Sequence, residues 1–169
     1  MNTDNWFDFS RYFSEGFGVV ELNGKVNYID KDGKLLSDAW FDEGYNFSDG
    51  FGVVQLNGKF NHIDKEGKLL SNTWFDFCNN FNEGFAGVTR IIGIKREFNY
   101  IDKKGKYLSD VWFDAIRPFH NGFARVKLGD KWGYIDKYGK YFADIWADFA
   151  YGFAPTQKCK FWFYIDKEG

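Results

Sequence analysis

The chain has 169 residues, of which 44% are hydrophobic and 27% charged, so it is long enough to fold around a buried core. Its formal net charge of −2 gives no general attraction to nucleic acid or to an anionic membrane, and we expect neither as a partner. No run approaches the roughly 18 consecutive apolar residues of a membrane helix. The opening MNTDNWFDFSRYF lacks the pattern of a signal peptide, so we expect a cytoplasmic protein.

Copies of one phrase divide the chain into tandem repeats. KWGYIDKYGK at 131–140 returns in altered form at 25–34, 59–68, 97–106 and 161–169. The tryptophans Trp6, Trp40, Trp74, Trp112 and Trp146 follow one another at spacings of 34, 34, 38 and 34 residues. A fixed period of this length is typical of repeat proteins. We therefore expect a single repeat domain over 1–169, with repeats at about 6–39, 40–73, 74–111, 112–145 and 146–169.

Within a repeat, most local signals indicate β-structure. The stretch from the tryptophan to a Gly-Phe step, such as 112–122, is compatible with a loop or one helical turn. The next residues, 123–128, alternate between apolar and polar, as a strand does. In repeats one and two, Asn-Gly then gives a strong hairpin signal at 22–25 and 56–59. A return strand such as 131–136 follows, then an Asp-Lys-x-Gly-Lys turn and a short third strand with the sequence LLS or YLS.

A unit of this size is too small to be stable alone, so neighbouring units must cover its aromatic face. Phe, Tyr and Trp make up 22% of the chain and outnumber all Ile, Leu and Val together. The sequence predicts an all-β fold in which five repeats of about 34 residues stack as an open array. A closed, propeller-like ring of five units is the alternative, because the opening MNTDNW matches the junctions LLSDAW and LLSNTW.

The repeat resembles the WG-repeat family. Residues 131–140 match the phrase K-W-G-Y-I-D-K-x-G-K, and FSEGFG at 13–18 and FNEGFA at 81–86 match the strand that precedes it. Only repeat four keeps the literal Trp-Gly, so the other repeats read as drifted copies. The resemblance covers nearly the whole chain. It implies an all-β scaffold found mainly in bacteria and their mobile elements, with no catalytic residues to carry over.

No group of residues points to catalysis or to a metal site. Asp30-Lys31-Asp32-Gly33 resembles the start of a calcium loop, but the second acid is missing from the other copies, which favours a turn capped by Asp. His62 and His120 occupy unrelated repeat positions and have no motif partner. Cys78 and Cys159 are too few for a disulfide framework. We therefore expect no catalytic residue, no metal and no cofactor, and a protein that is not an enzyme.

The remaining interpretation is a scaffold that binds a macromolecule. We expect this macromolecule to be a protein partner or a second copy of the same chain. Repeat three carries four added residues, which would lengthen its hairpin by two residues per strand without changing which face is buried. The predicted partner-binding residues at its tip are Arg90, Ile91, Ile92, Ile94, Lys95 and Arg96. The alternative for this tip is that the longer hairpin folds back over its own array. The alternative is a carbohydrate or cell-wall binder that uses the periodic aromatic row of Trp6, Trp40, Trp74, Trp112 and Trp146.

Overall fold

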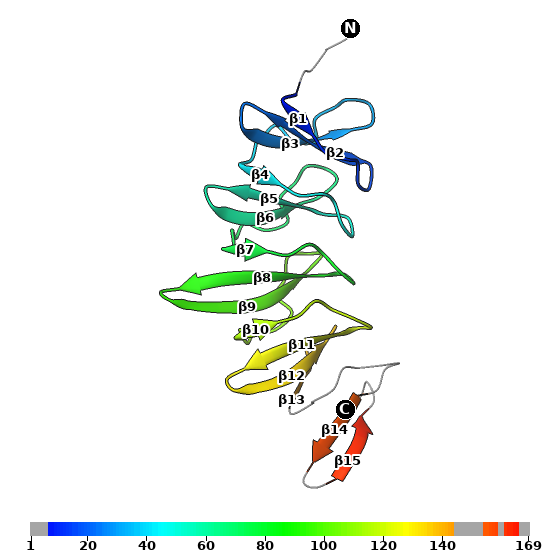
Figure 1. The fold of residues 1–169 in the computed structure, drawn as a ribbon, viewed down its shortest axis with the longest axis vertical. Helices are drawn as coiled ribbons and strands as arrows, with labels where there is room; N and C mark the ends of the chain where they lie inside the picture. The colour runs from blue at the N-terminus through cyan, green and yellow to red at the C-terminus, as the bar shows by residue number, and fades with distance from the viewer. Residues whose placement is uncertain (1–6, 144–153, 159–160, 166–169) are drawn as a thin grey trace. The chain divides into compact units, whose positions relative to one another are not determined.

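The computed structural model describes residues 7–143, 154–158 and 161–165 (Figure 1). In these ranges the chain consists of short antiparallel sheets and contains no α-helix, which confirms the all-β prediction. The chain forms two compact units, Met1–Phe81 and Asn82–Gly169. A single domain over 1–169 stays a prediction, as does the choice between an open array and a closed ring.

The strands are short, and most occur in hairpins. The first unit contains β1 (Phe9–Ser10), β2 (Phe17–Leu22), β3 (Lys25–Asp30), β4 (Glu43–Gly44), β5 (Gly52–Leu56), β6 (Lys59–Ile63) and β7 (Phe77–Cys78). The second unit contains β8 (Phe85–Ile92), β9 (Lys95–Asp102), β10 (Ala115–Ile116), β11 (Phe123–Leu128), β12 (Lys131–Asp136), β13 (Tyr141–Ala143), β14 (Ala154–Lys158) and β15 (Phe161–Ile165).

The predicted hairpin forms the centre of each repeat, and all the hairpins share one register. In repeat one, β2 pairs with β3 so that Val19 lies opposite Tyr28. The same two positions are paired in the later hairpins as Val53↔His62, Gly87↔Tyr100, Arg125↔Tyr134 and Pro155↔Tyr164. Residues with the same number within the repeat therefore occupy the same place in each hairpin.

The turns form as the sequence predicts. Asn23 and Gly24 have φ angles of 52° and 72°, the pair of positive values that a two-residue hairpin turn requires. In the second turn, Oδ1 of Asp30 accepts hydrogen bonds from the backbone N–H groups of Asp32 at 2.9 Å and Lys34 at 2.8 Å. The equivalent aspartates of the next three repeats make the same two bonds. These turns are capped by Asp, as expected.

The segment after Trp40, Trp74 and Trp112 is a loop that contains a short strand, namely β4, β7 or β10, and no helical turn. Phe41 exchanges backbone hydrogen bonds of 2.8 and 2.9 Å with Val26 of the preceding hairpin. Two residues later, β4 pairs with β5 of the following hairpin. In the second unit Phe113 pairs with Phe98, and β10 then pairs with β11. One extended segment therefore crosses between two successive hairpins and is bonded to both.

Within the described residues, the predicted third strand forms only in repeat four, where β13 pairs with β12. A Cβ added at Gly133 would lie 2.4 Å from the carbonyl oxygen of Phe142, so only glycine admits the returning strand there. Repeat one has Asn27 at this position, and its Nδ2 donates instead to the carbonyl of Ser37 at 2.7 Å. Asn61 and Asn99 do the same in repeats two and three. The asparagines therefore hold the returning chain by side-chain hydrogen bonds, where glycine in repeat four lets it pair as a strand.

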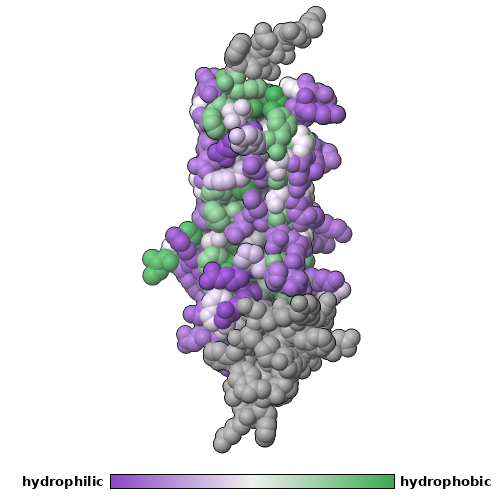
Figure 2. Space-filling view, turned by 45° about the vertical axis from the view of Figure 1, so that its right-hand side comes forward, coloured by the Kyte–Doolittle hydropathy of each residue, from purple (hydrophilic) through white to green (hydrophobic). Residues whose placement is uncertain are grey.

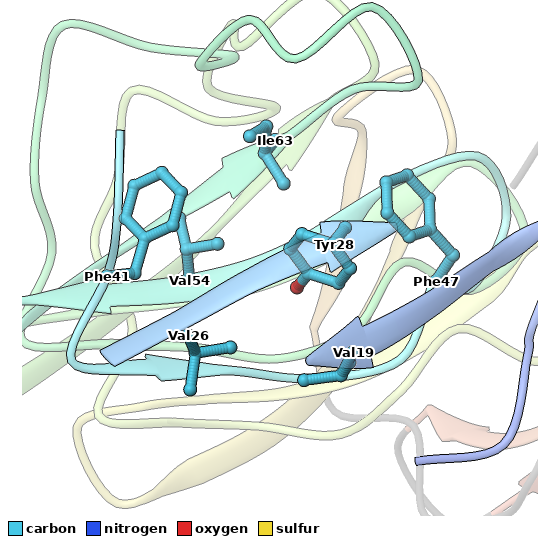
Figure 3. Packing of buried hydrophobic residues seen from close by; sticks show 7 residues of the cluster. All are labelled: Val19, Val26, Tyr28, Phe41, Phe47, Val54 and Ile63. Atoms are coloured by element: carbon cyan, nitrogen blue, oxygen red, sulfur yellow. The ribbon is translucent and has the colours of Figure 1, made fainter. Parts of the chain in front are cut away.

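Each unit has an apolar core built from successive repeats. In the first unit the ring of Tyr28 lies among six buried side chains from both repeats (Figure 3), namely Val19, Val26, Phe41, Phe47, Val54 and Ile63. The core of the second unit consists of Tyr100, Phe113, Phe119, Ala124, Val126 and Ile135. Aromatic rings supply much of both cores, as the composition predicts.

Candidate functional site

The candidate site is the tip of the β8–β9 hairpin, residues 90–96. Each of its strands has eight residues, compared with six in β2 and β3. The last pair before the turn is Ile92 and Lys95, and Gly93 takes the positive φ of 62° that the turn needs. The four added residues of repeat three are therefore divided equally between the strands, as predicted.

The isoleucines of the tip are exposed to solvent. Ile94 is fully exposed at the turn, Ile92 is 59% exposed, and Ile91 is also exposed. Figure 2 shows an apolar projection standing out from a mostly hydrophilic surface. Exposed apolar groups that are gathered in one place are typical of an interaction site.

The basic residues of the tip are organised by an acid that the sequence reasoning missed. Glu97 accepts from Nη2 of Arg90 at 2.8 Å and from Nζ of Lys95 at 2.9 Å. The hydrogen bond from Lys95, and after it the one from Arg90, lowers the pKa of the Glu97 carboxyl below its usual value. The same bond to Glu97 raises the pKa of Lys95. The strand register could have predicted this contact, because a turn at 93–94 places Glu97 opposite Arg90. Arg96 is exposed.

The tryptophans of the alternative site are half-buried where the structure describes them. Trp74 packs against the apolar core of the first unit. The guanidinium of Arg90 lies 3.9 Å from the centre of the Trp112 ring, which also meets Tyr107 edge to face. Trp40 is half-buried as well. Trp6 and Trp146 lie outside the described residues.

The two histidines lie in different environments. His62 is buried, and its Nε2 lies 2.8 Å from the carbonyl oxygen of Asn79, to which it can only donate. Burial lowers the pKa of His62 to about 4. It stands where Tyr28 stands in repeat one, so it is a core residue. His120 is exposed, and its backbone pairs with Phe123.

Cys78 is buried, and burial raises the pKa of its thiol well above the usual range. Cys159 lies outside the described residues. Among the residues that the structure describes, no group of three or more His, Cys, Asp or Glu side chains could hold a metal ion. That same part of the chain has no helix with the length and apolarity needed to cross a membrane.

Two solved structures that align with this chain are of Hsv2 from species of Kluyveromyces. Hsv2 of Kluyveromyces marxianus aligns with a TM-score of 0.50 and 12% identity, over 89% of this chain and 54% of that one. Hsv2 of Kluyveromyces lactis gives a TM-score of 0.49 and 11% identity, over 80% and 49% of the two chains. This chain thus spans about half the length of these proteins. At such low identity, the first match shows a shared β-fold and nothing about activity.

No curated protein matches the sequence. The family model described as WG containing repeat matches residues 28–60, 63–90 and 100–132, which together make up more than half of the chain. These matches include β5 of repeat two and most of β8 of repeat three. The chain therefore belongs to the family of WG containing repeat proteins.

Proposed function

We propose that this protein is a non-enzymatic, cytoplasmic repeat scaffold that binds another protein through the β8–β9 tip. The observation that carries the proposal is the exposure of Ile91, Ile92 and Ile94 on a hairpin lengthened beyond its neighbours. Membership of a repeat family supports a scaffold, because repeat arrays offer extended surfaces and tolerate insertions at their loops.

The chemistry of the tip indicates the kind of protein that it would bind. Glu97 engages Arg90 and Lys95, and the exposed cation Arg96 adds a third positive charge beside the isoleucines. A groove lined with apolar side chains and bordered by carboxylates would match this tip. Carbohydrate binding by the tryptophan row has less support, since Trp40, Trp74 and Trp112 are half-buried.

The test replaces Ile91, Ile92 and Ile94 with Thr. We expect the free energy of unfolding to change by no more than about 0.5 kcal/mol per residue, because the side chains are exposed. Proteins that the wild type captures from a bacterial lysate should be purified and their affinity measured. Loss of the three isoleucines should weaken binding at least about 30-fold.

A matched control removes three exposed aliphatic side chains elsewhere, by replacing Leu69, Val111 and Leu128 with Thr. This control should bind like the wild type. Protease treatment of the lysate should abolish capture if the partner is a protein. Equal binding by both triple variants, or a large loss of stability in the tip variant alone, would overturn the proposal.

A further inference from the structure

Successive repeats meet through one aromatic contact that recurs along the chain. Phe47, in the loop between β4 and β5, is 2% exposed and meets Tyr28 edge to face at 5.1 Å. The later counterparts of Phe47 are buried to the same extent. They form the pairs Phe81 with His62 at 4.8 Å and Phe119 with Tyr100 at 5.0 Å.

A hydrogen bond accompanies each of these ring contacts. The hydroxyl of Tyr28 donates to the carbonyl oxygen of Tyr45, two residues before Phe47, at 2.7 Å. His62 and Tyr100 lie within hydrogen-bond distance of the corresponding carbonyls of Asn79 and Arg117. The interface between repeats thus joins a phenylalanine ring and a nearby carbonyl on one side to a tyrosine or histidine on the other.

Repeat one presents the receiving half of this interface to solvent. Phe13 is the counterpart of Phe47, yet it is 55% exposed. Arg11, whose carbonyl corresponds to that of Tyr45, is exposed too. We call the ring of Phe13 together with the carbonyl of Arg11 the Phe13 face. In Figure 2 apolar surface gathers at this N-terminal repeat.

Phe13 is exposed at a position that is buried in later repeats, whereas the exposed residues near it have exposed counterparts. Tyr12 is 93% exposed, but its counterpart in repeat two, Asn46, is exposed as well. Phe9 is exposed, and so is its counterpart Glu43. Among these three aromatic residues, only Phe13 occupies a position that the other described repeats bury.

We propose that the Phe13 face of one copy receives the β14–β15 hairpin of a second copy, head to tail. Tyr164 lies opposite Pro155 in that hairpin, which is the register position that Tyr28 takes opposite Val19. In the proposed contact, Tyr164 would donate a hydrogen bond to the carbonyl oxygen of Arg11, as Tyr28 does to that of Tyr45.

Charge favours the same pairing. Residues 1–60 carry 5 basic and 10 acidic side chains, a net charge of −5, whereas residues 61–169 carry 17 and 14, a net charge of +3. The hairpin segment 154–165 contains two lysines and no acid. The opposite net charges of these two segments would favour contact between residues 1–60 of one copy and the later part of another. Because the two surfaces differ, the contact is heterologous and extends into chains or rings of copies.

The test measures association of the full chain by sedimentation velocity over a series of concentrations. Wild type should associate, and Phe13→Asp should weaken association about 100-fold, because a buried ring is replaced by a charge. Tyr12→Asp places the same charge one residue away and should leave association unchanged. If Phe13→Asp does not fold, Phe13→Leu keeps an apolar side chain and should weaken association about tenfold.

Mixing two variants tests the direction of the contact. Phe13→Asp keeps its hairpin and Tyr164→Asp keeps its Phe13 face, so each alone should stay monomeric and the mixture should form a one-to-one dimer. A monomeric wild type would overturn the proposal, and a lower melting temperature of Phe13→Asp would then indicate that the same chain covers the face. Equal loss in the Tyr12→Asp control would also overturn it.

Discussion

The hydroxyl of Tyr28 lies 3.0 Å from the carbonyl oxygen of Val53, 25 residues further along the chain and in the next repeat. The carbonyl oxygen of Tyr45 lies 2.7 Å from the same hydroxyl, so the two acceptors share its single proton. Burial raises the pKa of this hydroxyl well above its usual value, which keeps it protonated as a donor. One buried group therefore bonds two consecutive repeats.

Replacing Tyr28 with Phe should lower the free energy of unfolding by about 1–3 kcal/mol, because buried carbonyls lose a donor while the ring remains. Urea denaturation measures the change. Tyr138→Phe removes a hydroxyl from a ring that is 80% exposed and should have almost no effect. Equal midpoints for the two variants would contradict the role given to the Tyr28 hydroxyl.

Stability should fall in mild acid because of His62. Its pKa is about 4 in the folded protein, below the ordinary value of 6.5, so the unfolded chain binds more protons between these values. The contribution of neutral His62 is complete above pH 6.5 and is lost as the pH falls toward 4. From this shift we expect a loss of roughly 3 kcal/mol.

His62→Tyr is the matching variant, because tyrosine occupies this position in repeats one, three and four. It should remove the loss of stability between pH 6.5 and 4, as followed by urea denaturation at several pH values. It also removes Nδ1 of His62, which is buried without a hydrogen bond. An unchanged pH profile in the variant would assign the acid sensitivity to other groups.

Asn61→Ala should destabilise the first unit by about 2–4 kcal/mol. Its side chain donates to the carbonyl of Ser71 at 2.7 Å and accepts from the backbone N–H of His62, and both partners would be left unsatisfied. The exposed Asn46→Ala is the control and should change the free energy of unfolding by less than about 0.5 kcal/mol. Similar melting curves for the two variants would show that the returning chain does not depend on this amide.

Cys78 should be unreactive in the folded protein, because its thiol is buried and its raised pKa leaves almost no thiolate. The measurement is the rate of reaction with Ellman's reagent in a Cys159→Ser variant. We expect reaction only as urea unfolds the chain. Rapid, stoichiometric reaction in the native state would show that β7 opens readily.

The hairpins could be predicted because their signals are local. Alternation fixes the strands, and residues such as Asn23-Gly24 fix the turn between them. The lengthened tip followed from the same reasoning. The crossing segment could not be recognised, because Phe41 finds its partner Val26 fifteen residues earlier and its short strand gives no periodic signal. Glu97 was missed because its role depends on which residue lies opposite it.

The crossing segment also affects how such a protein can evolve. Since each segment bonds the hairpin before it and the hairpin after it, duplication of a stretch one period long restores both sets of bonds wherever the duplication begins. Unequal recombination within the gene can therefore add or remove whole repeats without creating a new kind of junction. Extra residues inside a period are tolerated best at a hairpin tip such as 90–96, where they lengthen both strands equally and keep the register of the hairpin. New binding specificity is expected to arise there first.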